Sequence, residues 1–186
     1  MGYVLHNRLG SGGFVVEATL ELAGLDYTYE PIKSEPSTPV LEKIGHINPW
    51  GQVPALVLPN GAVLTEVAAM ICYLAQQESG CHNGPHLWNT DHASFLRWSI
   101  FMSVNIYEGI LRRSYPERYF DLSSISDAEP STNNLVVDPS IKSTMSKSVQ
   151  MSAKKRVHNA FLLLEEVIQK DEFLLGPKMS SCDIFL

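Results

Sequence analysis

Two segments of this sequence place polar groups at the start of a predicted helix. Ser11 lies in the glycine-rich run from Gly10 to Gly13, and Glu66 with Val67 opens a helix further along the chain. The free N–H groups of a helix N-terminus suit an anion, and an acidic or hydroxyl side chain there also serves as an ordinary cap. Each segment is therefore either a candidate anion site or a plain helix start.

Cysteine and histidine residues form no pattern that binds a metal. The three cysteines, Cys72, Cys81 and Cys182, contain no CxxC pair. The histidines from His46 to His158 lack metal-ligand spacing. A disulfide framework, a zinc site and a dithiol redox motif are not expected.

Charge and hydropathy exclude further classes of protein. The chain has 186 residues and a net charge of −6, and residues 1–80 carry eight acidic side chains against three basic ones. A nucleic-acid partner requires the opposite sign. The longest apolar run, Val67 to Ala75, is far short of the ~20 residues of a membrane span. The N-terminus has no signal-peptide pattern, so a cytoplasmic protein is expected.

Residues 1–80 predict a small α/β domain. Strands are expected at 3–6, 27–32, 55–58 and 62–64, and helices at 14–23, 40–45 and 65–77. Phe14, Ala18 and Leu22 recur at i, i+4, as one face of the first helix would. The order β-α-β, then α, β-β-α, is that of a thioredoxin-like fold, with its first two strands parallel.

Beyond a linker at 81–91, residues 92–186 predict an all-helical domain. Residues 93–113 carry two apolar stripes, as in a helix buried on two sides. Residues 121–150 are rich in Ser and interrupted by Pro and Asn, which predicts a mobile loop. A helix then carries the stripe Val157, Phe161, Leu164 and Ile168, and Ser180 with Asp183 has the form of a capping box.

Several motifs, taken in order, resemble the glutathione S-transferases over nearly the whole chain. Residues 10–25, the segment Asn48-Pro49-Trp50-Gly51-Gln52-Val53-Pro54 and the stretch 61–66 resemble the family's N-terminal domain. Residues 116–119, 173–176 and 180–183 resemble marks of its helical domain. The resemblance implies a serine-type bacterial or fungal member whose helical domain is truncated at its C-terminus.

The resemblance also implies a glutathione site. Val53 would pair its backbone with the cysteinyl part of glutathione, next to a cis bond to Pro54. Glu66 would hold the γ-glutamyl amine. Val67 stands where the family usually has Ser or Thr, so only its backbone N–H remains for the carboxylate. Ser11 would donate a hydrogen bond to the thiolate, with capping alone as the alternative and Asn7 or Arg8 as substitutes.

The implied activity is transfer of the glutathione thiol, as cosubstrate, to a small electrophile, or isomerisation assisted by the thiol. The resemblance implies a cytoplasmic homodimer without nucleic-acid or membrane partners. Val67 and the end at Leu186 favour an alternative, a non-catalytic binding or assembly module on the same fold or a degenerate truncated pseudoenzyme.

Overall fold

The computed structural model describes residues 2–33, 40–77, 92–122 and 139–186. Packing divides them into two compact units. The first unit contains residues 1–102 and 167–186, and the second contains residues 103–166. The predicted domain limits, 1–80 and 92–186 around a linker at 81–91, stay a prediction, because the linker lies outside the described residues.

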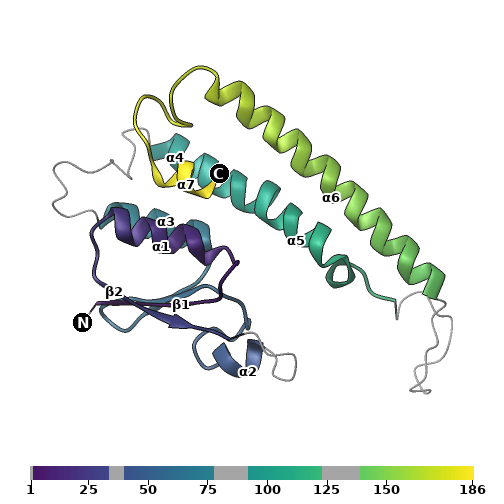
Figure 1. Ribbon diagram of the computed structural model, residues 1–186, viewed down its shortest axis with the longest axis horizontal. Coiled ribbons are helices and arrows are strands. Elements are labelled where there is room, and N and C mark those ends of the chain that lie inside the picture. Colours follow the sequence, from purple (N-terminus) through teal and green to yellow (C-terminus); the bar gives the residue numbers. More distant parts are fainter. Residues whose placement is uncertain (1, 34–39, 78–91, 123–138) are drawn as a thin grey trace. The chain divides into compact units, whose positions relative to one another are not determined.

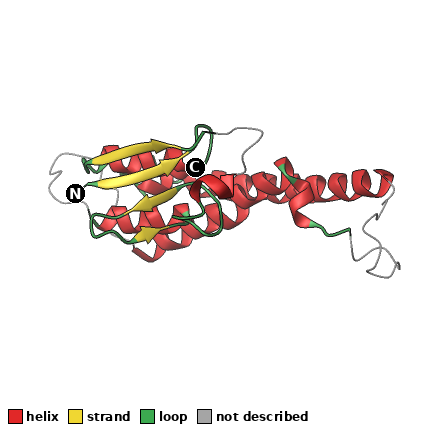
Figure 2. Ribbon diagram, turned by 90° about the horizontal axis from the view of Figure 1, so that it is seen from below, coloured by secondary structure: helices red, strands yellow, loops and turns green. Residues whose placement is uncertain are grey.

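A four-stranded sheet forms the base of the first unit (Figure 2). Its strands are β1 (Tyr3–Asn7), β2 (Tyr27–Pro31), β3 (Ala55–Val57) and β4 (Val63–Leu64), in the order β2-β1-β3-β4. β1 runs parallel to β2 and antiparallel to β3, and β4 is antiparallel to β3. This mixed sheet, with its β-α-β start and hairpin return, confirms the predicted thioredoxin-like domain.

Two helices cover one face of the sheet and a short one lies on the other (Figure 1). α1 (Gly13–Leu22) and α3 (Val67–Gln76) lie together over the strands, and α2 (Val40–Ile44) lies across the sheet from them. α3 buries Val67, Met70, Ile71 and Leu74, which share one helix face. α1 buries Val15, Val16, Thr19 and Leu20 instead of the predicted stripe, and Phe14 is 66% exposed.

The first unit also includes two elements from later in the chain. α4 (His92–Phe101) packs against α3, and α7 (Ser181–Phe185) packs against both α1 and α4. Ile184 and Phe185 lie against the core formed by residues such as Leu5, Val16 and Ile71. The predicted capping box is confirmed at the start of α7, between Ser180 and Asp183.

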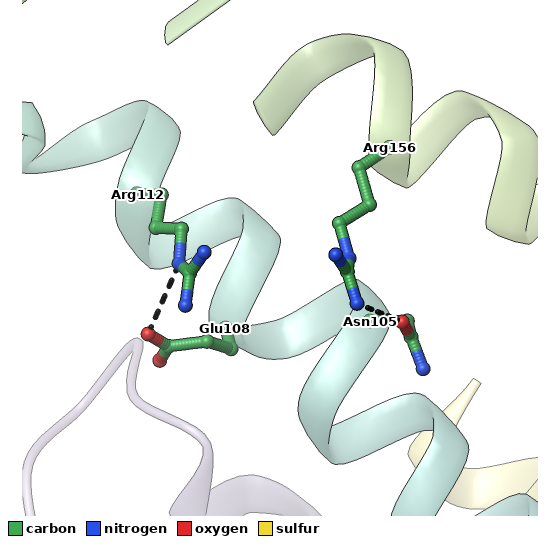
Figure 3. A network of polar contacts seen from close by, with 4 residues as sticks. All are labelled: Asn105, Glu108, Arg112 and Arg156. Carbon is green, nitrogen blue, oxygen red and sulfur yellow. Dashed lines mark hydrogen bonds and ion pairs between the residues drawn. The ribbon is translucent and has the colours of Figure 1, made fainter. Parts of the chain in front are cut away.

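The second unit is built on a pair of helical segments that pack closely. A π-helical stretch η1 (Met102–Tyr107) leads into α5 (Glu108–Ser114), and η2 (Pro116–Tyr119) follows. Arg156 on α6 (Pro139–Ile168) donates to the Asn105 side chain on η1, and Arg112 pairs with Glu108 along α5 (Figure 3). A Cβ on Gly109 would lie 2.4 Å from Val157 Cγ2, so glycine permits this close approach.

Two predictions for the helical part are wrong. The mobile loop predicted for 121–150 is wrong for residues 139–150, because α6 begins at Pro139, a residue whose missing N–H costs nothing in a first turn. Residues 123–138 lie outside the described part of the chain. The stripe predicted on α6 is partly exposed: Phe161 is 40% exposed, while Ala153, Ala160 and Leu164 are buried. Two of these three buried residues of α6 are therefore alanines rather than members of the predicted stripe. No helix among the described residues is long and apolar enough to cross a membrane.

Candidate functional site

The sheet register brings the predicted site segments to one end of the sheet. His6 pairs with Ala55, so the loop after β1 and the residues before β3 lie at the same end. Leu56 pairs with Leu64 in the antiparallel β3–β4 hairpin, so the residues after β4 reach that end as well. Ser11, Val53 and Glu66 are far apart in sequence, and each follows or precedes a strand at this end.

The Ser11 hydroxyl is held by the end of β1. Its Oγ donates a hydrogen bond to Asn7 Oδ1 and accepts a long one, 3.4 Å, from the Gly13 N–H. Asn7 is only 3% exposed, whereas Ser11 is half-buried at the surface of the site. Ser11 therefore has a structural partner for its proton, and the choice between cap and thiolate donor stays a prediction.

Gly13 is the residue that allows Asn7 to lie under the start of α1. A Cβ at position 13 would come within 2.1 Å of Asn7 Oδ1 and 2.2 Å of its Cγ. The backbone of Gly13 is helical, so its glycine is required by this contact and not by its own conformation. The amide of Asn7, at the end of β1, thus packs directly against the first residue of α1.

Val53 offers its backbone at the entrance to β3. The Val53–Pro54 peptide bond is cis, which confirms that prediction. Neither the N–H nor the C=O of Val53 makes a hydrogen bond with the described part of the chain. The preceding loop is fixed by Asn48, which is buried and donates to the Gln52 C=O. Val53 therefore presents a free donor and a free acceptor on an ordered loop.

Glu66 and Val67 form the start of α3. Glu66 has φ 67° and ψ 112°, and it is the one non-glycine residue of the described chain with a positive φ. Such a conformation costs about 1–3 kcal/mol and is found most often at functional sites. The side chain of Glu66 is exposed and does not cap the helix, so the first N–H groups of α3 have no side-chain acceptor.

Val67 differs from its neighbour because its side chain belongs to the core. Its side chain is 7% exposed and packs with those of Met70 and Ile71 on the buried face of α3. Its backbone N–H lies in the first turn, where helices leave donors free for an anion. Glu66 and Val67 are thus placed as predicted at a helix start, with a carboxylate and free amides at one position.

Arg8 was predicted only as a substitute for Ser11 as the thiolate donor. It follows β1 directly, its side chain is half-buried, and it makes no ion pair with the described part of the chain. Arg8 is thus a basic residue on the loop that follows β1, at the end of the sheet where Ser11 and Val53 lie. The signal in the sequence is that Arg8 is one of only three basic residues before position 80.

Cys72 and Cys182, the two cysteines that the structure describes, lie away from this end of the sheet, and they are partly buried and buried respectively. Cys182 is fully buried, its Sγ lies 3.3 Å from Ser99 Oγ, and burial raises its pKa to about 12, a shift that the Ser99 hydrogen bond reduces only in part. Burial also raises the pKa of Cys72. Among the described residues no group of three His, Cys, Asp or Glu could hold a metal ion.

Sequence comparison identifies the region that carries this geometry. The sequence model of the glutathione S-transferase N-terminal domain matches residues 15–77. Over these residues the chain is similar to the N-terminal domain of that family. The chain is also 26% identical over 111 residues to YncG, an uncharacterised GST-like protein of Escherichia coli strain K12. That alignment covers 59% of this chain and 53% of YncG, so the chain matches about half the length of this relative.

Solved structures share the fold of this chain along nearly its whole length. A glutathione S-transferase from Pseudomonas fluorescens has a TM-score of 0.68 at 19% identity, covering 100% of this chain and 81% of its own. A Sulfitobacter homologue with bound glutathione has a TM-score of 0.71 at 18% identity, covering 99% and 78%. Ure2p in complex with glutathione has 0.72 at 18% identity, covering 99% and 80%. The predicted fold class, a thioredoxin-like domain followed by a helical domain, is confirmed.

Proposed function

We propose that this protein binds glutathione and transfers its thiol to a small electrophile. The observation that carries the proposal is the convergence of the Ser11 loop, Val53 and Glu66 at one end of the sheet. Glutathione is a tripeptide with two carboxylates, an amine and a thiol. This end of the sheet offers a complementary partner for each of them. Two of its fold relatives, the Sulfitobacter homologue and Ure2p, were solved with glutathione.

The binding roles follow from the chemistry of each group. The free N–H and C=O of Val53, next to Pro54, would pair with the cysteinyl backbone as an added strand does. The exposed Glu66 carboxylate would hold the γ-glutamyl amine. The first amides of α3, including that of Val67, would hold the neighbouring carboxylate. Arg8 supplies a cation for the remaining carboxylate.

The catalytic step assigned to Ser11 is stabilisation of the thiolate. A thiol with a pKa near ~8.5 is mostly protonated at neutral pH, and donors near the sulfur lower that pKa. The thiol proton leaves to solvent. The sulfur lone pair then forms the bond to carbon, and the leaving group departs with the electrons of its own bond. In an addition or isomerisation, the electron pair moves into the substrate instead.

Calorimetric titration of glutathione into the purified protein tests the binding site. Measurable heat with one site per chain is the expected result, and no heat at high ligand concentration would overturn the proposal. Val67→Ser adds a hydroxyl at the first residue of α3, next to the amides that would hold the carboxylate, and removes a buried valine from the core. We therefore expect a lower unfolding free energy but an affinity that tightens by about 1 kcal/mol, roughly fivefold. The control is Ala69→Ser, which adds a hydroxyl to an exposed position of the same turn and should leave affinity unchanged.

A second candidate function is a glutathione-binding module without transferase activity. The observation that favours it is the engagement of the Ser11 hydroxyl by Asn7, together with Val67 in place of a hydroxyl residue. This module would bind glutathione in the calorimeter and leave its thiol pKa at the solution value. A lowered thiol pKa in the complex would favour the transferase.

The assembly and location belong to the same proposal. We infer a cytoplasmic homodimer from the family resemblance. Sedimentation of the purified chain at several concentrations tests the dimer, since a constant monomer mass would contradict it. A fluorescently tagged chain in its own cell tests the location.

A further inference from the structure

We propose that Asn7 is a positioning residue that competes with the glutathione sulfur for the proton of the Ser11 hydroxyl. This inference rests on the proposed glutathione site and adds a residue that acts through Ser11. Asn7 itself is 3% exposed. It acts by determining whether the hydroxyl proton of the half-buried Ser11 is available to a ligand.

The Ser11 hydroxyl can donate only one hydrogen bond. A serine hydroxyl has one proton to donate and lone pairs to accept. The proton is directed to Asn7 Oδ1, while a lone pair receives the Gly13 N–H. In this arrangement the hydroxyl is an acceptor toward a ligand. It becomes a thiolate donor only by turning away from Asn7.

The side chain of Asn7 is fixed in position and cannot move with the Ser11 hydroxyl or away from it. Its amide is packed against Gly13, where a Cβ would come within 2.1 Å of Oδ1. Its backbone C=O is fixed as well, because it accepts the N–H of Ile32 at 2.7 Å. The acceptor that holds the Ser11 proton therefore stays in place whether or not a ligand is present.

Donation of the Ser11 proton to the sulfur has an energetic cost. Turning the hydroxyl to the sulfur gives up one hydrogen bond to a buried acceptor and leaves Asn7 Oδ1 without its partner. The thiolate must compensate for this loss, so its stabilisation by Ser11 is smaller than the same serine would provide alone. Removing the competing acceptor should release the full effect.

The test uses Asn7→Leu, which keeps nearly the same side-chain shape over Gly13 and has no acceptor. The readout is the thiol pKa of bound glutathione, followed by thiolate ultraviolet absorbance against pH, with the ligand-free protein subtracted. We expect the thiolate fraction at mildly acidic pH to rise by roughly three- to tenfold in Asn7→Leu. The subtraction is clean below pH 9 for Cys182, whose pKa is about 12.

Three further variants separate this effect from a structural one. Asn7→Asp keeps an acceptor for the hydroxyl and should leave the pKa of the bound thiol at or above that of the unmodified protein. Asn7→Leu combined with Ser11→Ala should lose the gain entirely, because Asn7 acts only through Ser11. Asn7→Ala takes the place of Asn7→Leu where leucine prevents folding.

The possible results distinguish the two proposals. A lack of glutathione binding by the unmodified protein would overturn the proposed function and this inference together. Binding with the same thiol pKa in the unmodified protein and in Asn7→Leu would overturn this inference alone. The inference would also be overturned if Asn7→Leu lowered the pKa of the bound thiol by the same amount in a Ser11→Ala background. The decrease would then not depend on the Ser11 hydroxyl.

Discussion

At the residue scale, the geometry of the candidate site depends on the absence of a side chain at Gly13. Gly13 has no Cβ, and that space holds the amide of Asn7. Asn7 in turn holds the hydroxyl of Ser11. The three residues are therefore coupled, and a change at one should alter the cost of a change at another.

Gly13→Ala should expose this coupling. In the unmodified protein we expect the unfolding free energy to fall by about 1–3 kcal/mol, the usual cost of overpacking. In an Asn7→Ala background the new methyl has room, and Ala in a helical conformation should instead stabilise by about 0.4–1 kcal/mol. Urea unfolding of the two single variants and the double variant measures this. Equal costs in both backgrounds would contradict the contact.

Glu66 combines backbone strain with a binding role, and two variants separate them. Glu66→Gly removes the strain of φ 67° and should raise the unfolding free energy by about 1 kcal/mol, after the entropy cost of glycine. Glu66→Ala keeps the strain and should not stabilise. Both variants lose the carboxylate, so both should bind glutathione more weakly. Equal stabilities for the glycine and alanine variants would show that the conformation is not strained.

At the scale of elements, sequence periodicity predicted the existence of the helices and strands better than their buried faces. Tyr3, Leu5 and Asn7 alternate inward on β1, and glycine at 24 follows the end of α1. The face of α1 was mispredicted because Phe14, the largest apolar residue of its first turn, lies outward at 66% exposure. Pattern alone cannot tell an apolar residue that faces a site from one that faces the core.

The site was predictable only as separate segments. Ser11, Val53, Pro54, Glu66 and Val67 were identified by resemblance, and the strand register then places them at one end of the sheet. The bond between Ser11 and Asn7 could not be read from the sequence. It depends on how closely α1 approaches β1, which is set by Gly13 and by the packing of Val15 and Val16.

At the scale of elements, loss of the capping box at the start of α7 should clearly lower the unfolding free energy. Asp183 accepts from the Ser180 N–H at 2.7 Å, the Ser180 hydroxyl at 2.9 Å and the Leu174 N–H at 2.8 Å. Asp183→Ala leaves these donors without an acceptor and should lower the unfolding free energy by about 2 kcal/mol. Thermal unfolding measures it. Asp171→Ala, at an exposed position, is the control and should change stability by less than about 0.5 kcal/mol.

For the whole molecule, the buried thiol of Cys182 links stability to alkaline pH. Burial raises its pKa from 9.0 to about 12, so the folded state keeps the proton that the unfolded state loses. The stabilisation is complete below pH 9 and is lost as the pH rises towards 12. The slope is at most about 1.4 kcal/mol per pH unit for one group.

Cys182→Ala tests this dependence. Unfolding free energies measured by urea below pH 9 and again between pH 9 and 12 should fall less steeply for the variant than for the unmodified protein. Cys72→Ala is the comparison, since that side chain is only partly buried. A Cys182→Ala variant with the same slope as the unmodified protein would mean that another group governs the alkaline transition.

The return of α7 to the first unit has a consequence for synthesis. Cys182 meets Ser99 across 83 positions of sequence, and Ile184 with Phe185 completes a core that begins with Tyr3. On the ribosome, the sheet and its two covering helices emerge well before Ile184 and Phe185. Part of the hydrophobic surface of this nascent segment therefore stays exposed to water and to chaperones until residues 181–185 have emerged. The core of the first unit closes only after that point of synthesis.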